Sequence, residues 1–444
     1  MSAAGLIVAA PASGSGKTTI TMALLRALAR RGLRVAAAKA GPDYIDPGFH
    51  AAAAGRPCFN LDPWAMRPAT IATLIASLDD ADLILCEGAM GLFDGIDARG
   101  TGSCADLAAA TGWPVVLVVD AGGQAASVGA LVAGFAAHRP DVDVAGIIFN
   151  RVGGARHAEL LAEAVRLAAP QVRRLGALPR DARLALPDRH LGLVQAREHA
   201  DLARRLDQAA DRVSQSIDLD ALVALARPAR RASPNVSTSA SPPVPPLGQR
   251  IAVAHDDAFA FAYSWLLESW RAAGAELSMF SPLRDEAPPA GADAIYLPGG
   301  YPELHAARLA ANRRFLDGLR AAARRGVTIY GECGGYMVLG RTLTDAEGRT
   351  HALAGLLALD TSFATRRLTL GYRRARLSAP SPLGPAGTCY RGHEFHYSTV
   401  TDEARGPALF EVTDAGGRPM GTVGQRAGNV MGSFIHLVDR EPVW

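Results

Sequence analysis

The chain has 444 residues, which at roughly 150 residues per domain predicts two or three domains. Hydrophobic residues make up 49% and charged residues 20%, so global disorder is excluded, and a formal net charge of only +3 argues against nucleic acid as the main partner. The N-terminus lacks the basic stretch of a signal peptide, no apolar run approaches the roughly 18 residues of a membrane span, and the five cysteines are too scattered for a disulfide framework. We therefore expect a cytoplasmic protein without a membrane partner.

The first half of the chain alternates short apolar runs with helical patterns. Helical periodicity over 18–32 ends at a glycine, and the segment 180–195 is less regular. This alternation predicts an α/β fold with a doubly wound, mostly parallel sheet, in which ligands bind beyond the carboxyl ends of the strands. Buried strands are expected at 6–11, 34–40, 81–88, 114–121 and 144–150.

A change in composition divides the chain near its middle. Residues 228–248 contain six prolines and four serines, which is typical of a linker rather than a packed core. We therefore expect one domain over 1–227 and another over 249–444. The second domain restarts the β/α alternation, with strands expected at 250–256, 275–282, 293–300 and 326–335.

A phosphate-binding loop is predicted by APASGSGKTT (10–19), which stands between an apolar strand and an amphipathic helix. Gly14 and Gly16 would let backbone N–H groups approach a phosphate, Lys17 would supply a positive charge, and the Thr18 hydroxyl can bind Mg²⁺. The first glycine of the usual pattern is replaced by Pro11, and the alternative is a glycine-rich turn without a ligand. The expected ATP-binding residues are Gly14, Ser15, Gly16, Lys17, Thr18 and Thr19.

Carboxylates follow two of the predicted strands. Glu87 ends the strand over 81–88, and Asp43 and Asp46 follow the strand over 34–40. An isolated carboxylate at a strand end is usually a turn or a cap, but two strand ends would converge here on the edge that carries the phosphate loop. This favours a metal or substrate role, with Thr18, Asp46 and Glu87 as the expected Mg²⁺ ligands.

Three further polar residues each have two interpretations. Lys39 is either a solvated strand end or a cation that neutralises a transferred phosphate. Asn150, at the end of a third strand, either reads an adenine edge or forms a turn. Asp94, in MGLFDG (90–95), either orients a large substrate or makes an Asx-turn.

The second domain carries a candidate nucleophile. Cys333 lies between an apolar strand and a helix in TIYGECGGYMVLG (328–340), a pattern typical of a nucleophile elbow, in which the helix N-terminus would lower the thiol pKa. The other four cysteines fit a structural role better. Gly299 and Gly300 end another strand in LPGGYPEL (297–304), where their backbone N–H groups could form an oxyanion hole.

The thiol needs a base, and three histidines are candidates. His436 follows an apolar strand near the C-terminus, while His393 and His396 compete with it from RGHEFHYS (391–398). The His-x-x-His spacing suggests zinc, but no further ligands follow at suitable positions, so a substrate or interface role is preferred for that segment.

Together these motifs resemble those of the cobyrinic or hydrogenobyrinic acid a,c-diamide synthases, over essentially the whole chain. In that family a P-loop synthetase domain, similar to dethiobiotin synthetase, is fused to a class I glutamine amidotransferase domain. The motifs that carry the resemblance are KAGPDYIDPGFH (39–50), CEGAMGLFDG (86–95), HLGLVQA (190–196), LPGGYPEL (297–304), GECGGYM (331–337) and RGHEFHYS (391–398).

The resemblance implies a role for each site residue. Cys333 would attack the glutamine amide with His436 as its acid/base partner, and many class I amidotransferases place a glutamate two residues after this histidine. Here that position is Val438, so a third member is absent or comes from elsewhere. In the synthetase domain, Lys17, Thr18, Asp46 and Glu87 resemble the Mg²⁺-ATP set, and Asp43, Tyr44 and Asp94 resemble residues that handle the substrate carboxylate or its acyl phosphate.

The implied reaction uses ATP to turn a corrinoid carboxylate into an acyl phosphate, which ammonia from L-glutamine converts to an amide at two acetate side chains, a and c. Two close alternatives amidate other tetrapyrroles, namely cobyric acid synthase and the nickel-sirohydrochlorin enzymes. An alternative from another class is a P-loop switch ATPase, which would have no use for Cys333. The sequence is compatible with a homodimer and does not specify the metal content of the macrocycle.

Overall fold

The computed structural model describes residues 3–181, 188–189, 192–230, 242–403 and 406–441. Two compact units are present, one of Met1–Trp64 with Pro68–Thr238 and one of Ala65–Arg67 with Ser239–Trp444. The middle of the expected linker, 231–241, and part of the HLGLVQA motif, 190–191, lie outside the described residues. No helix in the described ranges combines the length and the apolar character needed to cross a bilayer.

The first unit is built on an eight-stranded sheet of order β3-β2-β4-β1-β5-β6-β7, and every neighbouring pair on this path is parallel. A short strand, β10, pairs antiparallel with β1. The strands are β1 (Ala4–Ala9), β2 (Val35–Ala40), β3 (Cys58–Leu61), β4 (Leu83–Glu87), β5 (Val115–Asp120), β6 (Val144–Val152), β7 (Arg173–Pro179) and β10 (Arg227–Pro228), with a separate hairpin of β8 (Asp188–Arg189) and β9 (Gly192–Leu193).

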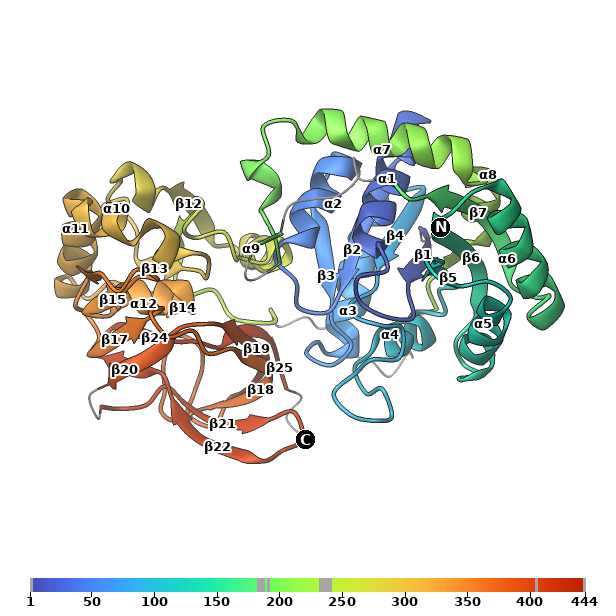
Figure 1. Cartoon of the computed structure of the whole chain (residues 1–444). Helices are drawn as coiled ribbons and strands as arrows, with labels where there is room; N and C mark the ends of the chain where they lie inside the picture. Colours follow the sequence, from blue (N-terminus) through green and yellow to red (C-terminus); the bar gives the residue numbers. More distant parts are fainter. Residues whose placement is uncertain (1–2, 182–187, 190–191, 231–241, 404–405, 442–444) are drawn as a thin grey trace. The chain divides into compact units, whose positions relative to one another are not determined.

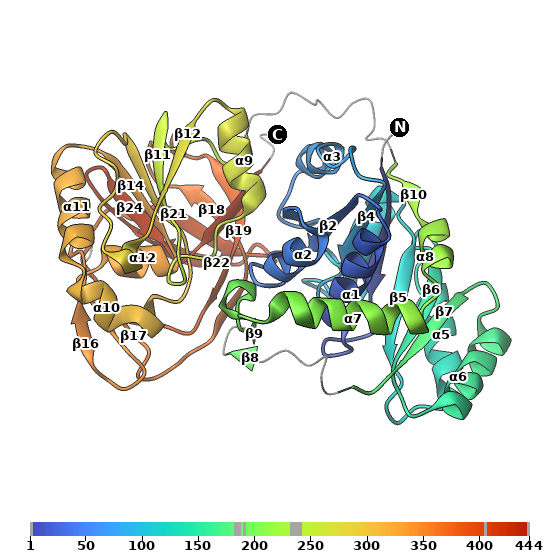
Figure 2. The same ribbon diagram turned by 90° about the horizontal axis from the view of Figure 1, so that it is seen from above.

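The helices of this unit connect the parallel strands. Figures 1 and 2 both show α7 running along α1, and these two helices contact each other. Apolar side chains fill β1, β4 and β5, whose residues are almost all buried, as expected for strands covered by helices. The helices are α1 (Lys17–Arg30), α2 (Asp46–Ala54), α3 (Pro68–Ala76), α4 (Cys104–Thr111), α5 (Ser127–Ala137), α6 (Ala155–Ala168), η2 (Ala196–Glu198), α7 (Leu202–Ser216) and α8 (Leu219–Leu225).

The second unit contains a six-stranded sheet of order β12-β11-β13-β14-β24-β23, parallel except for its last pair. Its strands are β11 (Arg250–Ala254), β12 (Glu276–Phe280), β13 (Ala294–Leu297), β14 (Thr328–Glu332), β23 (Gln425–Ala427) and β24 (Val430–Ser433). Its helices are α9 (Ser264–Ala272), η3 (Pro282–Arg284), η4 (Pro302–His305), α10 (Ala306–Ala311), α11 (Arg313–Arg324) and α12 (Gly334–Leu339).

Two smaller sheets complete the second unit. A five-stranded antiparallel sheet has the order β22-β21-β18-β19-β25, and a four-stranded sheet has the order β16-β15-β17-β20. Their strands are β15 (Thr342–Thr344), β16 (Thr350–Ala352), β17 (Leu359–Ser362), β18 (Thr369–Leu377), β19 (Cys389–His396), β20 (Thr399–Glu403), β21 (Phe410–Asp414), β22 (Pro419–Val423) and β25 (His436–Arg440).

The predicted α/β class with a parallel sheet is confirmed, and each of the nine predicted strands is present within a few residues of its expected bounds. The strands β3 and β7 and the two smaller sheets were not predicted. Strands of the two smaller sheets such as β18 are only partly buried, so they lack the long apolar stretch by which a strand is recognised in the sequence. In β18 this stretch is interrupted by arginines.

One glycine of α12 holds this helix against β13. A Cβ on Gly335 would lie 1.9 Å from the carbonyl oxygen of Leu297, and backbone of two packed elements cannot move apart cheaply. We therefore expect Gly335→Ala to lower the free energy of unfolding of this unit by about 3 kcal/mol, measured by urea unfolding. Gly291→Ala is the control, because its nearest neighbour is an Arg250 side-chain atom at 3.8 Å; a change within about 0.5 kcal/mol is expected there, and equal effects of the two variants would contradict the prediction.

Candidate functional site

The polar residues of the first unit meet because their strands are neighbours. In the parallel pairing of β2 with β4, Lys39 lies opposite Glu87, and in the pairing of β1 with β4, Val8 lies opposite Glu87. The phosphate loop follows β1, so it starts at the same edge of the sheet at which Lys39 and Glu87 end their strands. The expected convergence of these residues is therefore present.

A charged cluster lies at this edge. The Thr18 hydroxyl donates to Glu87 Oε1 at 2.7 Å and lies 3.3 Å from Asp46 Oδ2. Lys39 Nζ lies 2.6 Å from Asp46 Oδ2 and 3.1 Å from Glu87 Oε1, while His50 Nε2 contacts the other oxygen of Glu87. The Lys39 ammonium is thus held by two carboxylates and is not a solvated strand end, since Lys39 is only 4% exposed.

The electrostatics of this cluster keep Glu87 and Lys39 ionised. Burial alone would raise the pKa of Glu87, but the Lys39 ammonium and His50 outweigh it and lower the pKa to about 2. Burial also opposes the charge on Lys39, yet the Asp46 and Glu87 carboxylates raise its pKa well above the usual value. Both groups therefore stay charged at neutral pH.

The donor set of this cluster fits magnesium. Among the described residues no group of three or more His, Cys, Asp or Glu side chains is arranged to hold a metal ion. Magnesium, however, usually takes one or two carboxylates and completes its shell with water and phosphate oxygens. Thr18, Asp46 and Glu87 offer one hydroxyl and two carboxylates within contact of each other.

The phosphate-loop lysine has a local partner. Lys17 is buried, and its Nζ donates to the carbonyl oxygen of Met90 at 2.6 Å. Met90 is one of the non-glycine residues with a positive φ, at 50°, so its backbone is held in an uncommon conformation. Burial lowers the pKa of Lys17, which the Glu87 carboxylate partly offsets.

The phosphate loop has the backbone that the sequence predicts. Gly14 and Gly16 adopt φ angles of 77° and 89°, in the left-handed region that favours glycine. A Cβ on Gly16 would lie 2.3 Å from Asn150 Nδ2, so a larger residue would clash there. Ser15 closes the loop through its hydroxyl, which donates to the Ala12 carbonyl at 2.8 Å.

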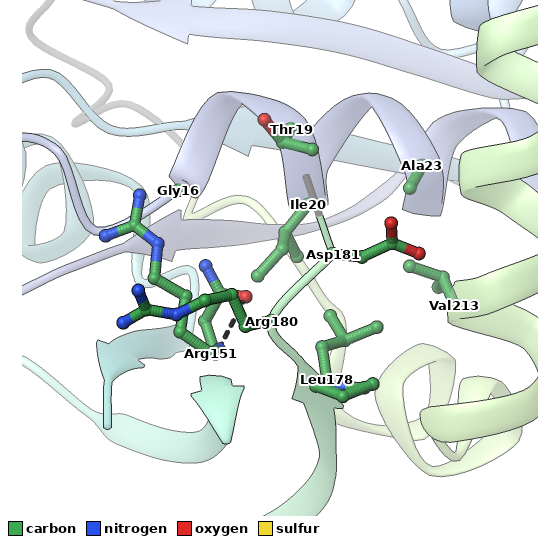
Figure 3. Close-up of a pocket in the computed structure, with 11 residues that line it drawn as sticks. Gly16, Thr19, Ile20, Ala23, Arg151, Leu178, Arg180, Asp181 and Val213 are labelled. Atoms are coloured by element: carbon green, nitrogen blue, oxygen red, sulfur yellow. Dashed lines mark hydrogen bonds between the residues drawn. The ribbon is translucent and has the colours of Figure 1, made fainter. Parts of the chain in front are cut away.

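A cavity of about 350 Å³ opens beside the loop, within the range typical of ligand pockets. Figure 3 shows it between the start of α1, the end of β7 and Val213 of α7. Its lining residues are Gly16, Thr19, Ile20, Ala23, Asn150, Arg151, Leu178, Pro179, Arg180, Asp181 and Val213. The cavity is therefore placed to take the part of a nucleotide that extends from phosphates at the loop.

Asn150 lines this cavity but is already hydrogen-bonded. Its Nδ2 donates to the Ser15 carbonyl at 2.9 Å, and its Oδ1 accepts from the Arg151 N–H at 3.0 Å. The amide thus fixes the phosphate loop and the backbone after β6. One Nδ2 N–H and one lone pair of Oδ1 are left over by these two bonds, so the amide can still read an adenine edge without breaking either of them.

The expected substrate residues lie in two loops. Asp43 Oδ1 accepts from the backbone N–H groups of Ile45 and Asp46 at the start of α2, and burial together with the Asp46 carboxylate raises its pKa to about 6. Tyr44, beside it, is half-buried. Asp94 is exposed, and its Oδ2 accepts from the N–H of Gly91, three residues before it, at 2.8 Å. This is a contact within the loop and not the Asx-turn expected as the alternative to substrate binding, in which the carboxylate would bond the N–H two residues after it.

The second unit presents Cys333 at a strained turn. Cys333 adopts φ 47° and ψ −104° between β14 and α12, and such strain in a non-glycine residue is typical of a nucleophile elbow. The expected lowering of its pKa was wrong: burial of Cys333, which is 3% exposed, reinforced by the Glu303 carboxylate, raises the pKa of the thiol and outweighs the opposite effect of the Gly334 N–H. A base must therefore take the proton when the thiol attacks.

His436 is placed next to this thiol. The backbone N–H of Cys333 donates to Ser433 at the end of β24, and the chain then turns into β25, whose first residue is His436. A Cβ on Gly299 would lie 2.5 Å from His436 Cε1, 3.3 Å from His436 Nε2 and 3.4 Å from Cys333 Cβ. Only glycine fits there, and an ideal Cβ on Gly334 would lie 3.0 Å from Gly300 N. Gly299 and Gly300 thus border the thiol and the imidazole.

The two competing histidines are buried beside this pair. His393 stacks on His436 with ring centroids 4.9 Å apart, and its Nε2 lies 2.8 Å from the Tyr263 hydroxyl. His396 stacks on Phe434. Burial lowers the pKa of His393 to about 3 and that of His396 to about 4. Residues three apart on a strand point to opposite faces, so this pair on β19 is not arranged to chelate zinc.

Comparisons with known proteins agree with both sites. Residues 6–194 match the model of the CobQ/CobB/MinD/ParA nucleotide binding domain, and residues 250–442 match that of the CobB/CobQ-like glutamine amidotransferase domain. The chain is 56% identical over 98% of its length to hydrogenobyrinate a,c-diamide synthase of Brucella anthropi, with 98% of that protein covered. Proteins of the same name from Brucella suis and Rhodobacter capsulatus are 57% and 53% identical, each with 98% of both chains covered.

The chain belongs to the hydrogenobyrinate a,c-diamide synthase family. Membership of this family confirms the resemblance drawn from the motifs. The protein is an amide-forming ligase of cobalamin biosynthesis that combines an ATP-using nucleotide-binding domain with a glutamine amidotransferase domain. This excludes the alternative of a P-loop switch ATPase.

Two residues of the site were not assigned from sequence. His50 stands in the family motif KAGPDYIDPGFH and contacts Glu87, but only the packing of α2 on β2, the neighbour of β4, reveals the contact. Glu332 precedes Cys333, and its Oε2 lies 3.8 Å from His436 Nδ1. Its position next to the nucleophile was the one signal available in the sequence.

Proposed function

We propose that this protein amidates the a and c acetate carboxylates of hydrogenobyrinic acid, with ATP as the source of activation and L-glutamine as the source of nitrogen. The supporting observation is the 56% identity, across 98% of both chains, to a protein named hydrogenobyrinate a,c-diamide synthase. The phosphate loop in one unit and the Cys333–His436 pair in the other supply the two chemistries that this reaction needs.

The first unit activates the carboxylate. A carboxylate is a poor electrophile because its oxygen leaves badly, so it attacks the γ-phosphorus of ATP and becomes an acyl phosphate while ADP departs. Lys17 moves from the Met90 carbonyl to the phosphate oxygens, and Lys39 balances the charge of the transferred group. Thr18, Asp46 and Glu87 would hold Mg²⁺, which when bound supplies further positive charge to the phosphates. Asp43, Tyr44 and Asp94 would position the corrinoid carboxylate.

The second unit releases ammonia. His436 takes the Cys333 proton as the sulfur attacks the glutamine side-chain amide, and the oxyanion is held by backbone N–H groups at Gly299 and Gly300. Ammonia leaves with that proton, and water hydrolyses the thioester to glutamate. The ammonia then attacks the acyl phosphate, forming the amide and releasing phosphate.

Product analysis by mass spectrometry tests the substrate. The enzyme is incubated with ATP, glutamine and one of four substrates, namely hydrogenobyrinic acid, cobyrinic acid, cobyrinic acid a,c-diamide or nickel-sirohydrochlorin. We expect two OH groups to be replaced by NH₂ on hydrogenobyrinic acid. Preference for nickel-sirohydrochlorin, or four amidations of an a,c-diamide, would instead support one of the related tetrapyrrole amidases.

The acyl phosphate makes an isotopic prediction. When the substrate carboxylates carry ¹⁸O, each amidation is expected to move one ¹⁸O atom into the released phosphate, because the attacking carboxylate oxygen leaves with phosphorus. The measurement is mass spectrometry of the phosphate, with ¹⁸O-labelled water and unlabelled substrate as the control. Phosphate labelled only from water would contradict the acyl-phosphate mechanism.

A further inference from the structure

Many class I amidotransferases orient the catalytic histidine with a glutamate two residues after it, but here that position holds Val438. Glu332 lies where a carboxylate partner of His436 would be needed. Its Oε2 is 3.8 Å from His436 Nδ1, while the Cε1–Nε2 edge of the same ring borders Gly299, whose other neighbour is Cys333 Cβ. The Nε2 side of the imidazole thus faces the part of the site that carries the thiol. Nδ1, on the other side of the ring, faces the Glu332 carboxylate. Both side chains are almost fully buried.

Three donors hold the Glu332 carboxylate in this place. The hydroxyl of Tyr296 donates to its Oε2 at 2.7 Å, the hydroxyl of Tyr330 donates to its Oε1 at 3.0 Å, and the backbone N–H of Leu437 lies 3.2 Å from Oε1. These donors come from β13 and β14 of the six-stranded sheet and from β25 of the five-stranded sheet, so the carboxylate is fixed by strands of two sheets. The Leu437 contact also ties it directly to the residue after His436.

We propose that Glu332 is the positioning residue that completes a Cys333–His436–Glu332 site, holding His436 with its proton on Nδ1 so that Nε2 can accept the thiol proton. The proposal rests on the proposed function of Cys333 and His436. A gap of 3.8 Å is longer than a hydrogen bond, but such contacts are often long without substrate and shorten when the substrate binds. The carboxylate then also stabilises the imidazolium that forms as the thiol attacks.

Glu332 differs in origin from a carboxylate placed two residues after the histidine. It is the residue before the nucleophile, so the same elbow carries both the thiol and the carboxylate on consecutive residues. Glu332 and Ser433 are opposite each other in the parallel pairing of β14 with β24, and the turn that follows Ser433 carries His436 over both residues.

The charge of Glu332 sets the expected pH dependence. Burial raises its pKa to about 7, partly offset by Tyr296, Leu437 and Tyr330. Burial lowers the pKa of His436 well below its usual value, and that of His393 to about 3, so neither imidazole titrates in this range. A protonated Glu332 would donate to Nδ1 and leave the proton of His436 on Nε2. Glutamine-dependent kcat/KM is therefore expected to fall as the pH drops through about 7.

The test uses the full-length enzyme with glutamine or ammonia as the nitrogen source. Glu332→Gln is expected to lower the glutamine-dependent kcat on the order of 10²- to 10⁴-fold and to change KM for glutamine little. Ammonia-dependent amidation should stay at the wild-type rate. The fall of glutamine-dependent kcat/KM at low pH, the acidic limb of the pH profile, should be absent in this variant. Asp345→Asn is the matched control, because Asp345 is also a buried carboxylate that contacts a histidine, His351 at 2.8 Å, but has no thiol beside it.

Tyr330→Phe keeps the test decisive if Glu332→Gln does not fold. Its hydroxyl lowers the pKa of Glu332, so its loss is expected to move the acidic limb of the enzyme to higher pH, an effect that a structural role alone would not produce. An unshifted limb in Tyr330→Phe, or wild-type glutamine turnover in Glu332→Gln, would overturn the proposal. Cys333→Ala separates this proposal from the proposed function. If Cys333→Ala loses glutamine use, either of these two results overturns only the role of Glu332. If Cys333→Ala still uses glutamine, the proposed function itself is overturned.

Discussion

Cys333→Ala is expected to abolish glutamine-dependent amidation, a loss of at least about 10⁴-fold, and to leave ammonia-dependent amidation at the wild-type rate. The thiol is the atom that forms the thioester, and no other described cysteine stands at a strained strand-to-helix turn. Added ammonia reacts after the thioester step, so it does not need the thiol that Cys333→Ala removes. The measurement is ADP formation and amide product with each nitrogen source.

Two matched variants accompany Cys333→Ala. Cys389→Ala removes a partly exposed cysteine of the same unit that has no elbow, and it should keep both activities. His436→Ala should reproduce the Cys333→Ala pattern, because the buried thiol has a raised pKa and cannot lose its proton unaided. Glutamine turnover that survives in His436→Ala would move the base to His393 or His396.

Lys17→Ala is expected to lower amidation by about 10³-fold or more with glutamine and with ammonia alike. Its ammonium donates to two carbonyl oxygens, those of Met90 and Ala12, which phosphate oxygens can replace. The nearby Lys39 is bound to two carboxylates and cannot take over this role without leaving them. Both nitrogen sources depend on the same activated carboxylate, so neither can rescue the variant.

Arg30→Ala serves as the control for Lys17→Ala. Arg30 is a cation on the same helix, α1, but it is exposed and pairs with Asp207 and Asp211, and such surface pairs contribute little to stability. Steady-state rates of ADP formation should be near wild type in Arg30→Ala. A Lys17→Ala enzyme that used ammonia normally would place the essential cation elsewhere, with Lys39 as the next candidate.

The first unit could be predicted largely from sequence because its site is assembled by local rules. Parallel strands end at one edge, so Lys39, Glu87 and the phosphate loop had to meet there once the strands were recognised. The fine contacts could not be predicted in the same way. Asn150 was expected either to bind adenine or to form a turn, and which atoms its amide meets depends on the path of the loop around Ser15.

The second unit was less predictable because its site joins distant segments. Cys333 was recognised by its elbow, which is a local pattern. His436 is brought to it by the pairing of β14 with β24, which links residues about a hundred positions apart. Such long-range strand pairing cannot be predicted from local sequence patterns. The sequence left a third member of the Cys333–His436 site absent or supplied from elsewhere, because Val438 stands two residues after His436. The proposed partner, Glu332, precedes the nucleophile, and only the fold brings it to 3.8 Å from His436 Nδ1. The direction of the thiol pKa was also predicted wrongly, since burial outweighs the Gly334 N–H at the start of α12.

The burial of Cys333 has a consequence for the durability of the enzyme. Oxidants and alkylating agents react with thiolates. Cys333 is only 3% exposed and its pKa is raised, so almost no Cys333 thiolate is accessible to these reagents. Cys58, Cys86 and Cys104 are buried as well, which leaves Cys389 as the most accessible thiol among the described residues. Peroxide should therefore modify Cys389 first, and the nucleophile should stay reduced until bound glutamine draws its proton to His436.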